Sequence, residues 1–211
     1  MLKTKGYWIW DEALSSATHG IGALLSIAGL ILLILRALHE GSALRLVTFI
    51  IYGSILIIFY LMSTLFHSLY FTRAEKLFRI FDHASIYLLI SGTYTPYCLV
   101  TIRGWLGWLI LSVIWLMTVL GIVYKSIWIG HLQKLSTIIY VIMGWMCLIG
   151  GRALWNGLGR IGFGLLFLGG IVFTVGAVIY SFKSIPFGHV IWHLLVMVGT
   201  ILMYFSIYLY V

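Results

Sequence analysis

The residues with the clearest capacity for chemistry are two histidines near the carboxyl end of the chain. His189 and His193 are four residues apart in the apolar stretch Phe187–Val198. On a helix, side chains at this spacing share one face, with Cβ atoms about 6 Å apart. Two imidazoles placed this way can bind one metal ion. The alternative is that both rings hydrogen-bond to neighbouring helices, and the pair alone leaves both interpretations open.

The composition is typical of a membrane protein. Of the 211 residues, 63% are hydrophobic and 9% are charged. A soluble fold of this size cannot bury so much apolar surface, and several stretches reach the ~20 apolar residues that cross a bilayer. The net charge of +8 is therefore attributed to loops that orient the helices and meet anionic headgroups, not to nucleic-acid binding.

The hydropathy pattern predicts an all-α polytopic membrane protein with seven transmembrane helices. An interfacial segment, residues 1–15, precedes a single transmembrane domain, residues 16–211. The expected spans are Ser16–Leu38, Leu44–Tyr70, Ile80–Thr101, Trp105–Tyr124, Leu135–Gly150, Ile161–Phe182 and Phe187–Val211. Pro96 predicts a kink in the third span. Lys and Arg are more frequent at the amino terminus and in the loops on its side, which predicts a cytoplasmic amino terminus and an extracytoplasmic carboxyl terminus.

This topology places several polar residues at similar depth near the cytoplasmic face. His67 lies one turn before the end of the second span, and Asp82 lies just inside the third. His189 and His193 open the seventh span, and His19 opens the first. Histidines placed at random along alternating helices would not be expected to gather at one face. The coincidence therefore favours a metal site over a chance pair.

Three imidazoles would leave a fourth tetrahedral position open for water, as in catalytic zinc sites. Zinc lowers the pKa of such a water to about 7. Asp82 is the acidic residue placed inside a predicted span, and its carboxylate could exchange a proton with that water. Ser63 is four residues before His67 and shares its helix face, so its hydroxyl could stabilise a developing oxyanion.

Each of these residues also has a purely structural interpretation. Asp82 could form an ion pair with a loop arginine such as Arg79. Ser63 could hydrogen-bond to a carbonyl of its own helix. A nucleophilic triad of Ser63, His67 and Asp82 is a further alternative, but it leaves His189 and His193 without a role. His83 is expected to point elsewhere on its helix, and His19 either supports the site or simply packs.

Four motifs together resemble the bacterial hemolysin III family, which is related to the progestin and adipoQ receptors and, more distantly, to alkaline ceramidases. They are Glu12–Gly20 (EALSSATHG), Ser63–His67 (STLFH), Phe81–Pro96 (FDHASIYLLISGTYTP) and Gly188–His193 (GHVIWH). The resemblance covers essentially the whole chain. It implies seven helices in a bacterial inner membrane, with a cytoplasmic amino terminus and a zinc site on the cytoplasmic side.

The resemblance also implies roles for individual residues. His67, His189 and His193 would be the zinc ligands. Asp82 would contact the zinc-bound water, and Ser63 would line the site. The family usually has asparagine where this chain has Ser15, which puts a polar contact between that position and Glu12 in doubt.

Three functions follow as hypotheses. The first is a zinc-dependent intramembrane hydrolase of a lipid amide or ester, with a role in membrane lipid homeostasis and with Asp82 and Ser63 as catalytic residues. The second is a non-catalytic sensor of membrane state, receptor-like, in which zinc has a structural role. The third is a pore-forming hemolysin, for which the sequence offers no secretion signal. The expected partner in the first two is a membrane lipid.

Overall fold

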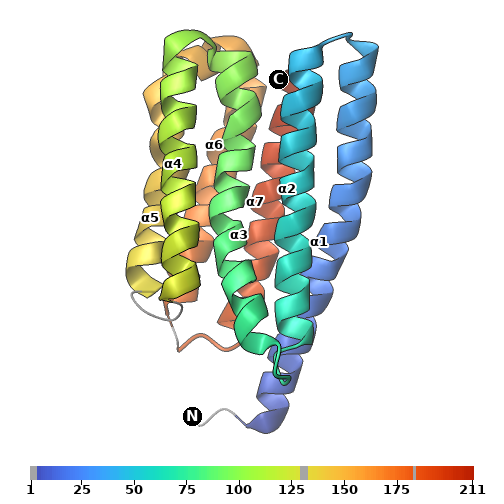
Figure 1. Ribbon diagram of the computed structural model, residues 1–211, viewed down its shortest axis with the longest axis vertical. Coiled ribbons are helices and arrows are strands. Elements are labelled where there is room, and N and C mark those ends of the chain that lie inside the picture. The colour runs from blue at the N-terminus through green and yellow to red at the C-terminus, as the bar shows by residue number, and fades with distance from the viewer. Residues whose placement is uncertain (1–3, 129–132, 183) are drawn as a thin grey trace.

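The computed structural model describes residues 4–128, 133–182 and 184–211, and none of these residues lies in a β-strand. The elements are α1 (Lys5–His39), α2 (Ala43–Ser68), α3 (Glu75–Pro96), η1 (Tyr97–Ile102), α4 (Gly104–Ile127), α5 (Gln133–Trp145), η2 (Met146–Gly150), α6 (Gly151–Ser181) and α7 (Gly188–Tyr210). The first turn of α1 and the last turn of α7 lie at opposite ends of the bundle (Figure 1).

Six helical stretches in the described part of the chain are long and apolar enough to cross a membrane. One of them, Leu135–Ser181, has 47 residues and contains most of α5, all of η2 and all of α6. Within it, α5 and α6 run in opposite directions (Figure 1). The structure therefore confirms an all-helical membrane architecture, whereas the count of seven spans and the orientation of the amino terminus stay predictions.

The first helix begins earlier than the hydropathy predicts. Thr4 caps it, with Oγ1 accepting a hydrogen bond from the backbone N–H of Tyr7 at 3.3 Å. From there α1 continues for 35 residues to His39, without a break between residues 15 and 16. Residues 5–15 are thus the first turns of the same helix, and these turns extend beyond the ends of the other helices (Figure 1). Their place at the membrane interface stays a prediction.

Pro96 ends the α-helical part of the third span. A proline has no N–H for the hydrogen bond along the helix, and the backbone widens into the π-helical turn η1 directly after it. Arg103 and Gly104 then take positive φ values of 57° and 56°, which reverse the chain into α4. The kink expected at Pro96 is therefore a change of helix type.

The predicted loop between the fifth and sixth spans is largely helical, because α6 begins at Gly151. Gly159 interrupts this helix with a φ of 67°, a conformation that glycine adopts without steric strain. The predicted start of the sixth span near Ile161 therefore corresponds to the resumption of the helix after this break.

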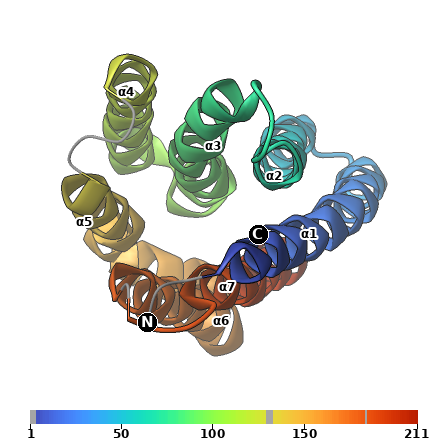
Figure 2. The same ribbon diagram turned by 90° about the horizontal axis from the view of Figure 1, so that it is seen from below.

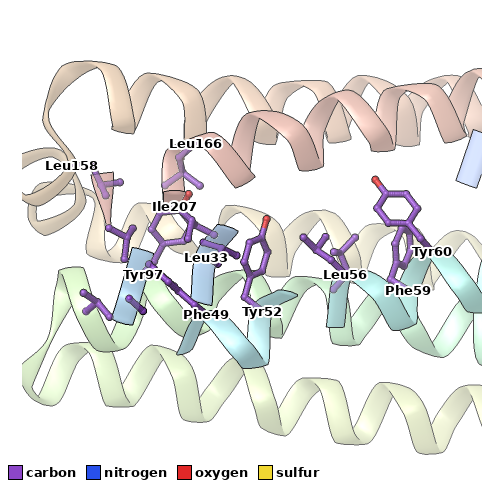
Figure 3. Packing of buried hydrophobic residues seen from close by; sticks show 14 of the residues in the cluster. Leu33, Phe49, Tyr52, Leu56, Phe59, Tyr60, Tyr97, Leu158, Leu166 and Ile207 are labelled. Atoms are coloured by element: carbon purple, nitrogen blue, oxygen red, sulfur yellow. The ribbon is translucent and has the colours of Figure 1, made fainter. Parts of the chain in front are cut away.

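Seen along the bundle axis, the helices surround an interior, and α7 lies between α1 and α6 (Figure 2). Aromatic and branched side chains pack in this interior (Figure 3), most of them toward the end of the bundle away from the first turn of α1. The labelled residues of this core are Leu33, Phe49, Tyr52, Leu56, Phe59, Tyr60, Tyr97, Leu158, Leu166 and Ile207. This packing sets which faces of α2 and α7 meet at the other end of the bundle.

Candidate metal centre

Three histidines from two helices meet near the end of the bundle where α1 begins. His67 lies at the end of α2, and His189 and His193 lie in the first turns of α7. His189 Nε2 is 3.2 Å from His67 Nε2 and 3.0 Å from His193 Nε2. The ligand atoms of all three lie within 4.8 Å of one another. These distances are close enough for the three histidines to hold one metal ion.

The start of α7 is held in place by the start of α1. Phe187 precedes α7 with a φ of 52°, which is unfavourable for a bulky side chain. Its N–H donates a hydrogen bond to the Tyr7 hydroxyl at 2.8 Å, and the two rings lie 4.7 Å apart. Tyr7 therefore stabilises the turn from which His189 and His193 project.

Neighbours on α1 fix the ring orientation of two of the histidines. His67 Nδ1 lies 2.6 Å from Glu12 Oε2, and His193 Nδ1 lies 3.2 Å from the carbonyl oxygen of Ser15. Carboxylate and carbonyl oxygens accept hydrogen bonds, so each Nδ1 carries the hydrogen. The Nε2 atoms of His67 and His193 are then lone-pair acceptors that face the centre of the cluster. This is the arrangement by which proteins orient metal-binding histidines.

The cluster of nitrogens fits a bound cation better than a set of hydrogen bonds. A neutral His189 has at most one hydrogen on Nε2, and that hydrogen can point to only one of its two neighbours. At least one pair of nitrogens then faces each other with no hydrogen between them, which a cation would relieve. Zinc bonds of about 2.0–2.1 Å in tetrahedral geometry place two nitrogens about 3.3 Å apart, close to the spacings here.

A cavity of about 150 Å³ connects the histidines to the interior of the bundle. Ser63 and Asp82 line it together with His189 and His193, and most of its remaining wall is apolar. The residues predicted to flank a metal therefore line one cavity beside the histidine cluster.

The structural alternatives for Ser63 and Asp82 are not formed. Ser63 is buried, and its Oγ has no hydrogen-bond partner among the described residues, so it does not bond back to its own helix. Arg79 pairs with Glu75 and lies over the ring of Phe66 instead of pairing with Asp82. Both side chains line the cavity, and Asp82 Oδ2 lies 3.7 Å from Nδ1 of its neighbour His83.

The other two histidines of this region lie beside the cluster. His19 is buried and stacks on His193, with ring centroids 3.7 Å apart and an interplanar angle of 16°. His83 lines the cavity beside Asp82, and its Nδ1 donates to the carbonyl of Arg79 at 2.8 Å. His19 thus supports a candidate ligand through its ring, whereas His83 is tied to its own helix.

Comparison with known proteins places the chain in a family. A family model described as haemolysin-III related matches residues 7–204. The chain belongs to the haemolysin-III-related family. This membership confirms the resemblance inferred from the four sequence motifs.

Two Bacillus relatives match this haemolysin-III-related chain over nearly its full length. Hemolysin-3 of Bacillus cereus is 45% identical over 204 residues, which are 97% of this chain and 93% of the relative. The Hemolysin-3 homolog of Bacillus subtilis (strain 168) is 42% identical over 204 residues, 97% of this chain and 96% of the relative. The human monocyte to macrophage differentiation factor is 28% identical over 166 residues, 76% of this chain and 68% of the relative.

Sequence reasoning about this haemolysin-III-related protein placed His19 near the site but missed the contacts that Glu12 and Ser15 of α1 make with two of the candidate ligands. Glu12 was assigned to an interfacial segment, yet its carboxylate is buried against His67. A signal was present, because Glu12, Ser15 and His19 follow helical spacing and form one polar face. All three are buried at the candidate metal centre.

Proposed function

We propose that this protein is a zinc-dependent intramembrane hydrolase that cleaves an amide or ester bond of a membrane lipid, with a role in membrane lipid homeostasis. The observation that supports it is the cavity shared by the histidine cluster, Asp82 and Ser63. Its apolar walls suit an acyl chain, and its polar residues gather where a metal would bind. Zinc bound to the three histidines would supply Lewis acidity and activate a water molecule.

Asp82 and Ser63 divide the remaining chemistry in this proposal. The Asp82 carboxylate takes the proton released by the attacking water and returns it to the leaving group. Ser63 Oγ donates a hydrogen bond to the carbonyl oxygen of the lipid as negative charge develops on it. Ser63 Oγ has no hydrogen-bond partner among the described residues, and the Asp82 carboxylate faces His83 Nδ1 at 3.7 Å and does not pair with Arg79.

The proposal also includes the topology. We count Leu135–Ser181 as two spans, which makes seven, and place the amino terminus in the cytoplasm of a bacterial cell. The candidate metal centre then lies near the cytoplasmic face of the plasma membrane, and the carboxyl terminus lies outside. The excess of basic residues in the loops on the amino-terminal side supports this orientation.

Replacement of Asp82 tests the chemistry directly. We expect Asp82→Asn to bind zinc as the wild type does and to lose at least about 100-fold in hydrolysis, because a positioned proton carrier contributes about 10²–10⁴-fold. The measurement is product release by the reconstituted full chain from a fluorescent acyl amide and the matching acyl ester. Glu75→Gln on the same helix is the control and should keep its activity. Full turnover by Asp82→Asn would rule out this mechanism.

A second candidate is a membrane-state sensor in which zinc is structural. The histidines come from α2 and α7, so a bound ion would join two helices, and this observation favours such a role. The two functions differ in product formation. A sensor would release no lipid product from any amide or ester, with or without Asp82.

A further inference from the structure

The cavity beside the histidines contains a buried lysine that the proposed chemistry does not use. Lys125 lies in the last turn of α4, is 1% exposed and lines the cavity that Asp82 and His193 also line. A lysine this close to a helix end usually extends its flexible side chain to the headgroups. Ser126 and Trp128 are exposed, so the surface of the protein lies close to this position in the chain.

Lys125 has no anionic partner among the residues that the structure describes. Among the described residues, no carboxylate lies within 4.0 Å of its ammonium, and none accepts a hydrogen bond from it. Its contact is the ring of Tyr124, with Nζ 5.8 Å from the ring centroid. A buried cation is strongly disfavoured without a counter-ion, so an anion arriving from outside would be stabilised here.

Hydroxyl groups on α5 line the same cavity. Ser136, Thr137 and Tyr140 line it together with Lys125. Hydroxyls can donate hydrogen bonds to the oxygens of an anion that an ammonium attracts. The rest of the wall is largely apolar and includes Ile86, Ile90, Val141, Phe173 and Val196. An amphiphile has a charged head group and an apolar chain. A charged side chain beside an apolar cavity can therefore bind both parts of an anionic amphiphile.

We propose that Lys125 binds the carboxylate or phosphate of an anionic amphiphile whose acyl chain occupies the cavity beside the histidines. Ser136 and Thr137 add hydrogen bonds to the same anionic group. The link to catalysis rests on the proposed function. If the protein is that hydrolase, binding by Lys125 restricts its substrates to lipid amides or esters that carry an anionic group. Neutral lipids of the same chain length would lack the partner for Lys125.

Direct binding measurements on the full chain test this assignment. The protein is reconstituted with its metal in nanodiscs of phosphatidylcholine, and the probes are hexadecanoate, hexadecyl phosphate, hexadecanol and inorganic phosphate. We expect Lys125→Gln to weaken the binding of the first two at least about tenfold and to change hexadecanol binding less than about threefold. Lys125→Arg should retain the anionic ligands, and Lys76→Gln, an exposed lysine on α3, is the control.

Three results would overturn the proposal. If Lys125→Gln weakens the binding of hexadecanoate and hexadecanol equally, Lys125 only shapes the cavity. If the variant binds hexadecanoate as the wild type does, Lys125 is not part of the site. Inorganic phosphate binding as tightly as hexadecyl phosphate would indicate a site for a free anion, not a lipid. Lys125→Met carries the same expectation if Lys125→Gln does not fold. Because binding requires no turnover, selective binding without hydrolysis would leave this proposal standing and remove the enzymatic one.

Discussion

The contact between Glu12 and His67 shows how single residues prepare the candidate metal centre. The carboxylate and imidazole are both buried, with Oε2 and Nδ1 2.6 Å apart. The carboxylate holds the hydrogen on His67 Nδ1. His67 Nε2 then keeps its lone pair, which can bind a metal ion. Such partners of metal ligands contribute to affinity although they do not touch the metal.

We therefore expect Glu12→Gln to lower zinc affinity by about 10–100-fold. The measurement is competition with a chromophoric chelator, after metal analysis has established about one zinc per wild-type chain. His193→Ala, which removes a candidate ligand, should retain no zinc under the same conditions. Glu40→Gln is the matched control, because Glu40 pairs with Arg36 and Arg45 at the opposite end of α1. Wild-type affinity in Glu12→Gln would remove Glu12 from the site.

At the scale of elements, the π-helical turn after Pro96 requires a glycine on the helix that packs against it. Gly107 of α4 is buried against the carbonyl of Cys98, which accepts a hydrogen bond from the N–H of Arg103 at 2.9 Å. A Cβ at position 107 would overlap that carbonyl oxygen. The backbone cannot yield as a flexible side chain can, so α4 would have to move away.

Gly107→Ala should accordingly destabilise the protein by about 1–3 kcal/mol, the usual effect of overpacking. The readout is the thermal midpoint of the detergent-solubilised full chain, followed by size-exclusion chromatography. Gly164→Ala on α6 is the control, because an added Cβ there meets no atom within 4 Å. That variant should be neutral or slightly stabilised, by up to about 1 kcal/mol. Equal midpoints for the two variants would contradict this account of η1.

At the scale of the whole molecule, the candidate metal centre connects parts of the chain that are far apart in sequence. His67 and His193 belong to α2 and α7, and both are oriented by residues of α1. A bound ion would therefore join α2 and α7 at one end of the bundle, beside the residues of α1 that orient its ligands. Whatever the protein does, occupancy of the site should be coupled to its stability.

Removal of the metal is expected to lower the thermal midpoint of the wild type. A ligand present at 100 times its dissociation constant stabilises the folded state by about 2.7 kcal/mol. The midpoint is measured with and without a chelator and after zinc is added back. His193→Ala should not respond to either treatment. If the chelator does not change the thermal midpoint of the wild type, that result would argue against a metal joining α2 and α7.

The proposed orientation can be tested with thiol labelling of intact cells. Cys98 and Cys147 are first replaced by serine. His39→Cys is then at the last residue of α1, next to the link to α2, and Arg73→Cys is between α2 and α3. Both positions are exposed. A membrane-impermeant reagent should label position 39 and should reach position 73 only after the cells are opened. The reverse pattern would place the candidate metal centre on the outer side.

Some of this protein was determined by its sequence alone. Hydropathy and helical spacing are local properties, and they predicted the helices and the shared depth of His67, His189 and His193. Two observed helix boundaries differ from the predicted ones. Thr4 caps α1 earlier in the chain than hydropathy predicts, and the positive φ of Gly159 interrupts α6. The expectation that Asp82 and Ser63 are catalytic stays a prediction.

Only the tertiary structure decided which faces of the helices meet. Glu12 reaches His67 and the Ser15 carbonyl reaches His193 because packing rotates the polar face of α1 toward α2 and α7. In the same way, the packing of α4 turns Lys125 into the cavity and away from the surface. Rotation of a helix about its axis depends on contacts between distant segments, and no local pattern specifies it.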